Sequence, residues 1–132
     1  MKSKLMLASV LLLFALTPLM AGAATLEGTI QGYQCVTQGK TCPIGQEDPL
    51  AAAENVFVIQ TKSNDYYFIP NIDRATLARH INDVVRVNGT VDSRYKSITA
   101  DSFEYMKNGM WVTAWSPKMQ DELENGLYKG NK

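Results

Sequence analysis

The sequence predicts a small, mostly β domain with minor α-helix, preceded by an export signal. Three observations lead to this fold class. Short segments of alternating apolar and polar residues follow one another from Thr25 onward, and this period of two is typical of half-buried strands. One short helical pattern interrupts them at 73–81, and an apolar leader precedes them all.

The first 23 residues have the composition of a secretory signal peptide. A positively charged start is followed by an almost wholly apolar stretch at 5–20, and small residues at 21–23 are typical of a cleavage site. We predict cleavage after Ala23 or Ala24. The alternative is a retained anchor, but the apolar stretch is short for a membrane span. We therefore expect a periplasmic or secreted chain without a membrane span after cleavage.

The mature chain is expected to be one domain with a slight acidic excess. The leader holds two of the 13 basic residues and none of the 13 acidic ones, which leaves 11 basic against 13 acidic residues, or about −2. Proteins that bind nucleic acid usually carry a basic excess on the surface that contacts phosphate. The charge therefore argues against a nucleic-acid partner. We expect a monomer with one hydrophobic core.

The first strand is predicted at 25–33. One face carries Leu26, Gly28 and Ile30, and the other carries Glu27, Thr29 and Gln31. A glycine inside a strand indicates strong bending or a close approach of another backbone. We expect one of these at Gly28.

A long irregular segment, 34–54, follows the first strand and contains both cysteines. A loop of this length in a small domain is usually functional or needs its own staple. Asp48 and Pro49 precede a short alanine-rich run. We predict one helical turn there, with Asp48 as the N-cap and Pro49 at the first helical position.

The second and third strands are predicted at 55–62 and 65–69, joined by a tight turn at 63–64. Pro70 ends the third strand because it has no N–H to donate to a neighbouring strand. The candidates for the buried faces of these strands are Phe57, Ile59, Tyr67 and Ile69.

A short helix is predicted at 73–81. Asp73 can cap its N-terminus, and Leu77 and Ile81 lie four residues apart on one face. The two arginines of the segment are expected to face solvent. We place this helix between the third and fourth strands.

The stretch 83–105 predicts two further strands, joined by a polar turn at 92–97. Val85 and Val87 give the first of them a period of two. In the second strand the apolar spacing changes near 101–102. We expect a bend or β-bulge at that point.

The C-terminal part, 107–132, begins with a turn at 107–109. An apolar segment with two tryptophans follows at 110–115, and it forms either a sixth strand or a segment that lies across the sheet. The last predicted element is an amphipathic helix at 117–128, with apolar residues at four-residue spacing.

Strand, strand, strand, helix, strand, strand is the order of the OB-fold, a five-stranded Greek-key barrel. We therefore predict an OB-fold barrel at 24–106 with a C-terminal helical tail. The segments LEGTI (26–30), YYFI (66–69) and VRVNGTVD (85–92) also resemble the periplasmic bacterial OB-fold family of small exported proteins, over about 25–105. The resemblance implies a soluble periplasmic binding or stress-related module, and it supplies no catalytic motif.

Cys35 and Cys42 are the sharpest chemical feature of the chain. Two cysteines in an exported protein most often form a disulfide, and closing this small loop is worth roughly 2–3 kcal/mol. One alternative is a redox-active pair, although such pairs usually have Cys-X-X-Cys spacing and a thiol at a helix N-terminus. Another is a metal site that adds His80, Glu47 or Asp48 to the sulfurs, but the chain has no second Cys or His pair with structural-zinc spacing.

A disulfide would turn the residues between the cysteines into a compact lobe. Gly39 supplies the permissive backbone position that such a reversal needs. The lobe would then project the rest of the loop over one end of the barrel.

No pattern in the chain marks a catalytic centre, a cofactor site or a firm metal site. We expect a non-catalytic binding or interaction module for a small solute, an oligosaccharide or an envelope protein. The alternative is a thiol-redox or metal-binding protein that uses both cysteines. Exposed aromatic residues either bind the ligand or cover the core and barrel ends. The candidate ligand-binding residues are Tyr33, Glu47, Asp48, Tyr66, Tyr95 and Trp111.

Overall fold

The computed structural model describes residues 22–129. The predicted signal peptide lies outside these residues except for its last two positions, which begin the first strand. That strand pairs residues 22–24 with 89–91 of a neighbouring strand, so cleavage after Ala24 would remove these pairs. No helix within the described range is long and apolar enough to cross a membrane.

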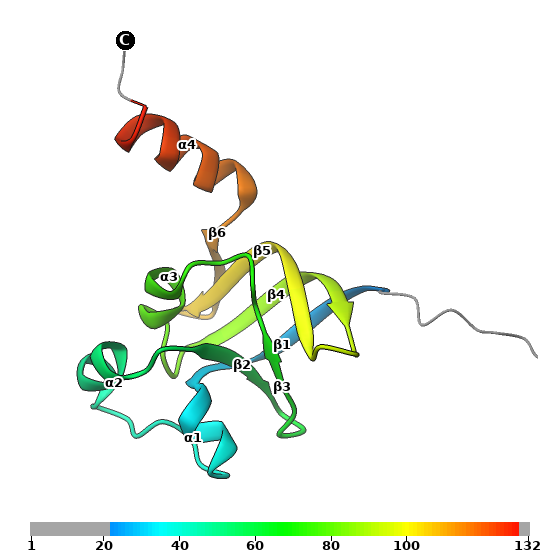
Figure 1. The fold of residues 1–132 in the computed structure, drawn as a ribbon, viewed down its shortest axis with the longest axis vertical. Coiled ribbons are helices and arrows are strands. Elements are labelled where there is room, and N and C mark those ends of the chain that lie inside the picture. The colour runs from blue at the N-terminus through cyan, green and yellow to red at the C-terminus, as the bar shows by residue number, and fades with distance from the viewer. Residues whose placement is uncertain (1–21, 130–132) are drawn as a thin grey trace, which may run out of the picture.

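The prediction of a mostly β chain with short helices is confirmed (Figure 1). Within residues 22–129 the elements are, in order, β1 (Gly22–Gly32), α1 (Tyr33–Thr37), α2 (Glu47–Ala53), β2 (Phe57–Thr61), β3 (Tyr66–Phe68), α3 (Arg74–Ala78), β4 (Val84–Asp92), β5 (Ser97–Lys107), β6 (Met110–Trp115) and α4 (Pro117–Leu127). The short helix α3 falls between the third and fourth strands, as predicted.

The strands form one sheet in the order β3-β2-β1-β4-β5-β6. All neighbours in this order are antiparallel. One further pair is parallel and joins Phe68 of β3 to Ser97 of β5, where the Phe68 N–H also donates to the carbonyl of Lys96 at 2.8 Å. The sheet therefore curls until β3, at one edge, meets β5.

The sheet has six strands rather than the five of the predicted barrel. The apolar segment after the 107–109 turn forms β6 and pairs with the end of β5. Asn108 and Gly109, with φ of 51° and 76°, make the turn that permits this pairing. Trp115 at the end of β6 is buried. Because burying its large indole is favourable, this residue helps to hold β6 against the sheet.

The predicted bulge in β5 is confirmed at Asp101. Asn88 pairs with Ser102 and Gly89 pairs with Ala100, which leaves Asp101 without a partner on β4. The extra residue bends β5 and so contributes to the curl of the sheet (Figure 1).

Gly28 lies where another backbone approaches closely, also as predicted. A Cβ at this position would stand 2.0 Å from the carbonyl oxygen of Gln60 on β2. Gly89 is in the same situation against the carbonyl oxygen of Thr99 on β5. Both positions exclude a side chain, which is the arrangement expected where strands coil tightly over one another.

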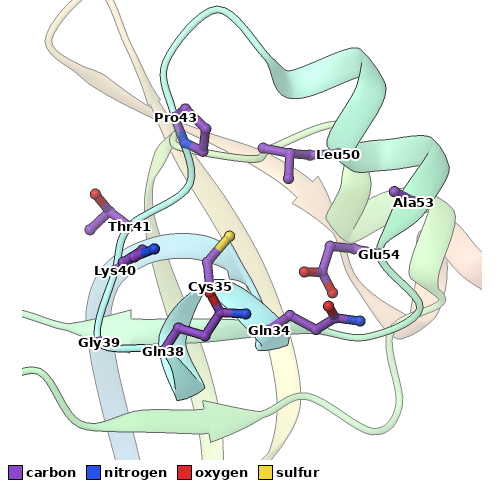
Figure 2. Close-up of a pocket in the computed structure, with 10 residues that line it drawn as sticks. All are labelled: Gln34, Cys35, Gln38, Gly39, Lys40, Thr41, Pro43, Leu50, Ala53 and Glu54. Atoms are coloured by element: carbon purple, nitrogen blue, oxygen red, sulfur yellow. The ribbon is translucent and has the colours of Figure 1, made fainter.

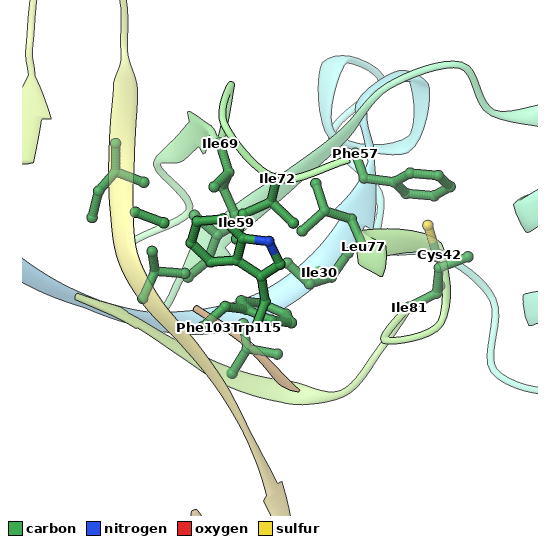
Figure 3. Packing of buried hydrophobic residues seen from close by; sticks show 14 residues of the cluster. Ile30, Cys42, Phe57, Ile59, Ile69, Ile72, Leu77, Ile81, Phe103 and Trp115 are labelled. Carbon is green, nitrogen blue, oxygen red and sulfur yellow. The ribbon is translucent and has the colours of Figure 1, made fainter. Parts of the chain in front are cut away.

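The hydrophobic core lies inside the curl of the sheet and includes Leu77 of α3 (Figure 3). The predicted faces are confirmed for Phe57, Ile59 and Ile69, whereas Tyr67 is only half-buried. The core cluster consists of Ile30, Cys42, Phe57, Ile59, Ile69, Ile72, Leu77, Ile81, Val85, Val87, Ile98, Ala100, Phe103 and Trp115. One of the two cysteines therefore belongs to the core, although it comes from the long loop.

Helix α3 begins as predicted, because Asp73 Oδ1 accepts the Thr76 N–H at 2.9 Å and so satisfies a free N–H of the first turn. Arg74 is exposed, but its guanidinium donates hydrogen bonds to backbone carbonyls. Its Nε donates to the carbonyl of Glu54 at 2.9 Å, and its Nη2 donates to the carbonyls of Ala51 and Glu54. The last carbonyls of a helix lack partners within the helix, so this arginine ties α3 to the end of α2.

Candidate functional site

The long segment between β1 and β2 builds the candidate site. It folds as two short helices, α1 and α2, joined by an extended linker (Figure 1). Cys35 lies within α1, a helix in the segment predicted to be irregular, because β1 ends at Gly32 and the chain turns directly into the helix. The Tyr33 N–H donates to the carbonyl of Val56 at 2.9 Å and holds α1 beside β2.

Helix α2 starts two residues earlier than the predicted turn, which makes the expected N-cap wrong. Gln46 is the N-cap, without a capping hydrogen bond from its side chain, and Asp48 lies in the first turn. Glu47 accounts for the shift because its Oε1 accepts the Gly45 N–H at 3.0 Å. This bond fixes the backbone before the helix.

A cleft of about 800 Å³ opens between α1, the linker and α2 (Figure 2). Amide, hydroxyl, amino, thiol and carboxylate groups line it together with a few apolar side chains. The lining residues are Gln34, Cys35, Gln38, Gly39, Lys40, Thr41, Pro43, Leu50, Ala53 and Glu54.

The two cysteines meet at this cleft. Both are free thiols in the structure, and their Sγ atoms are 3.2 Å apart. The predicted disulfide is thus not formed here, but the chain reversal expected for it is present, with φ of 70° at Gly39. The Lys40 N–H donates to the Cys35 carbonyl at 2.9 Å and closes the turn.

The surroundings of the two sulfurs differ. Cys35 is partly exposed and lines the cleft, whereas Cys42 is only 2% exposed. Burial raises the pKa of the Cys42 thiol to about 11, even though the Gly32 N–H donates to its Sγ at 3.1 Å. Cys42 is therefore protonated at neutral pH.

A chain of hydrogen bonds, here called the Gln31 network, holds the linker in place. The Cys42 N–H donates to Gln31 Oε1 at 2.5 Å, and Gln31 Nε2 donates to Asn82 Oδ1 at 3.0 Å. Asn82 Nδ2 donates in turn to Glu47 Oε1 at 3.0 Å, the same oxygen that binds Gly45. The network comprises these five residues. It joins β1 and the turn after α3 to the linker, at Cys42 and Gly45, and to the first residue of α2.

Glu54 is not among the predicted site residues, yet it lies at the inner wall of the cleft (Figure 2). It is only 5% exposed. A Cβ on Gly32 would stand 2.7 Å from the Cγ, Cδ and Oε1 atoms of Glu54, so the carboxylate packs over a backbone without a side chain. Among residues 22–129, its hydrogen bonds with Arg74 use the Glu54 backbone carbonyl and leave the carboxylate without a donor.

The structure does not bring the six predicted ligand residues together. Tyr33 and Tyr66 form an aromatic cluster with Phe68, with ring centroids 5.4–5.9 Å apart, and a hydrogen bond with Tyr66 raises the pKa of Tyr33. Lys96 Nζ lies 4.5 Å from the Tyr66 ring centre. None of these residues lines the cleft.

The other four candidates lie elsewhere. Tyr95 is exposed in the turn between β4 and β5, and Trp111 stacks under the guanidinium of Arg86 at 4.4 Å. Glu47 belongs to the Gln31 network, and Asp48 is exposed on α2.

The proposed metal ligands are likewise separated. His80 Nδ1 bonds to Asp83 Oδ2 at 2.9 Å, and its ring packs against Tyr105 with a centroid separation of 4.6 Å. In the part of the chain that the structure describes, no three His, Cys, Asp or Glu side chains are grouped to hold a metal ion.

The chain matches no protein-family model, no curated protein and no solved structure at a significant level.

Proposed function

We propose that this chain is an exported, non-catalytic binding module. It holds a small solute with a positively charged amino group in the cleft between α1 and α2. The observation that carries this proposal is the Glu54 carboxylate, which lines the cleft and accepts no hydrogen bond from residues 22–129.

The proposed architecture is an OB-fold barrel extended by β6. Support comes from the sheet order and from the parallel contact between β3 and β5. The position of α3 between β3 and β4 is also the one that the OB-fold uses. In this architecture, the long connection between the first two strands carries the ligand site.

No side-chain oxygen among residues 22–129 is both fully buried and without a partner, so the Glu54 carboxylate is open to the cleft. A ligand ammonium group that enters the cleft would form charge-assisted hydrogen bonds with it. Glu54 reaches the cleft from the end of α2, and Gln34 of α1 lines the same cleft (Figure 2). The amide of Gln34 can then orient the rest of the bound solute.

The dimensions and the apolar part of the lining favour a small solute over a polymer. A volume of about 800 Å³ lies within the range of pockets that enclose small molecules. Leu50, Ala53 and Pro43 provide surface for the carbon skeleton of a solute. An oligosaccharide site would be favoured by aromatic side chains along the groove, but no aromatic residue in the described part of the chain lines this cleft. Tyr33 and Tyr66 form a separate cluster with Phe68, and Trp111 lies against Arg86.

Lys40 is the only basic residue in the lining of this cleft, and it is exposed. A solute with a carboxylate at the other end of its skeleton could bind this amino group. Zwitterionic solutes therefore belong to the proposed ligand class along with simple amines.

The test is a thermal-shift and calorimetric panel of small primary amines, each paired with the alcohol of the same carbon skeleton. We expect amines to raise Tm and their alcohols to leave it unchanged. Glu54→Gln should weaken amine binding by roughly ten- to a hundredfold, the worth of one charged hydrogen bond. Glu124→Gln, an exposed acid on α4, serves as the matched control. Equal binding to wild type and Glu54→Gln, or no binding by any amine, would contradict the proposal.

A further inference from the structure

We propose that Cys35 and Cys42 form a thiol–disulfide exchange site that opens into the cleft, with a small-molecule disulfide as its oxidising substrate. Cys35 is the sulfur that reacts with the substrate, and Cys42 is the sulfur that closes the intramolecular bond. This proposal does not rest on the binding of amines by Glu54.

The position of the sulfurs assigns these two roles. Cys35 lines the cleft, and its sulfur points into the open space (Figure 2). Cys42 is 2% exposed and packs with the core residues (Figure 3). An external disulfide can therefore reach Cys35 but not Cys42.

The sulfurs are already placed for closure. They are 3.2 Å apart, and a disulfide bond needs a further approach of about 1 Å. The Gln31 network fixes the backbone of Cys42 to β1, and the Lys40 N–H fixes the Cys35 carbonyl. Only a small side-chain movement separates the dithiol from the disulfide.

The Gly32 N–H gives the buried sulfur a specific role. It donates to Cys42 Sγ at 3.1 Å, and the same bond would favour negative charge on that sulfur as it forms or leaves as a thiolate. Burial opposes this charge in the resting dithiol. Cys42 thus reacts only when Cys35, whose Sγ lies 3.2 Å away, is already bonded to a substrate sulfur that can leave as a thiolate.

The exchange has two steps. Cys35 first loses its proton to water in the cleft. The resulting thiolate attacks one sulfur of the substrate, the substrate S–S bond breaks, and one substrate thiolate leaves. Cys42 then loses its proton to water and attacks Cys35 Sγ, which releases the second substrate thiolate. The protein loses two electrons and two protons, and one substrate disulfide becomes two thiols. Excess substrate thiol reverses both steps.

The test treats the reduced mature protein, which lacks the predicted leader, with oxidised glutathione as the substrate. Intact mass spectrometry follows the products. Wild type should lose two hydrogens without retaining an adduct. Cys42→Ala should accumulate one glutathione adduct, mapped by peptide analysis to Cys35. Cys35→Ala should react at least tenfold more slowly when folded. In denaturant the two variants should react with oxidised glutathione at equal rates. That result would assign the difference between the folded variants to the fold.

A time course on wild type keeps the test independent of how well the variants fold. A brief pulse of a thiol-alkylating reagent on the reduced protein should label Cys35 before Cys42. Oxidised wild type should return to the dithiol in excess reduced glutathione while it stays folded. Equal labelling of both thiols, or a bond that resists reduction until the protein unfolds, would overturn the proposal. Neither result bears on the binding of amines.

Discussion

At the scale of single residues, Gln31 shows how a polar side chain is used inside this domain. It is 2% exposed, and its amide binds three partners: the Cys42 N–H, Asn82 Oδ1 and Thr29 Oγ1. The alternation of β1 predicts the face on which Gln31 lies but not its burial. Burial follows because the linker crosses this face and presents a backbone N–H that needs an acceptor.

Gln31→Leu should lower the free energy of unfolding by about 1–3 kcal/mol. The leucine fills the space but leaves the buried Cys42 N–H without an acceptor, and an unsatisfied buried donor costs this much. Denaturant unfolding of wild type and variant measures the difference. Gln38→Leu, on the exposed side of the cleft, should change stability by at most about 0.5 kcal/mol. A loss at position 31 no larger than at position 38 would show that the network contributes little.

At the scale of elements, the unit between β1 and β2 is held by side chains rather than by its own helices. Helices as short as α1 and α2 are not stable alone. The Gln31 network holds the linker between them, and Arg74 binds the carbonyls at the end of α2. The order of this unit, and hence the shape of the cleft, depends on those contacts.

Acid should loosen the linker through Glu47. Hydrogen bonds from Asn82 and Gly45 lower the pKa of Glu47 below its ordinary value of 4.5. Stabilisation from this group is therefore complete above the unfolded-state pKa and is lost as pH falls through the lower, folded-state pKa. Hydrogen exchange of the Gly45 amide, compared with that of core amides, should speed up selectively below pH 4.5. Glu47→Gln should remove this selective acid response.

Oxidation of the cysteine pair should stabilise the domain without changing its strands. Under oxidising conditions, Cys35→Ser should have a free energy of unfolding lower than wild type by roughly 2–3 kcal/mol, the value for closing so small a loop. The far-UV circular dichroism of the strands should be the same in both proteins. In reducing buffer the difference should shrink below about 1 kcal/mol, because neither protein then has the bond. A difference that persists in reducing buffer would assign the stabilisation to packing of the thiol.

At the scale of the whole molecule, features with a local cause could be predicted from the sequence. Asp73 caps α3, Asp101 forms the bulge and Gly28 meets a neighbouring backbone. In each case the chemistry of one or two residues decides the outcome. Features with a non-local cause could not be predicted in the same way. The pairing of β6 and the binding of Arg74 to α2 depend on which elements become neighbours.

The same distinction holds for the candidate site. The spacing of Cys35 and Cys42 in a loop with a permissive Gly39 predicted that the two sulfurs would meet, and they lie 3.2 Å apart. Glu54 was missed because an acid after a run of alanines has the pattern of an exposed helix end. Its burial is caused by Gly32 on another element, which leaves room for the carboxylate.

The central claim is that the cleft between α1 and α2 binds a small amine through Glu54. Amide chemical-shift mapping by NMR tests it most directly, with the amine that raises Tm most and its paired alcohol. We predict saturable shifts at Gln34, Gln38 and Ala53 with the amine, and none with the alcohol or in Glu54→Gln. Two results would contradict the account. One is a set of shifts centred on Trp111 or on the aromatic cluster of Tyr33, Tyr66 and Phe68. The other is the same shifts at the cleft in Glu54→Gln.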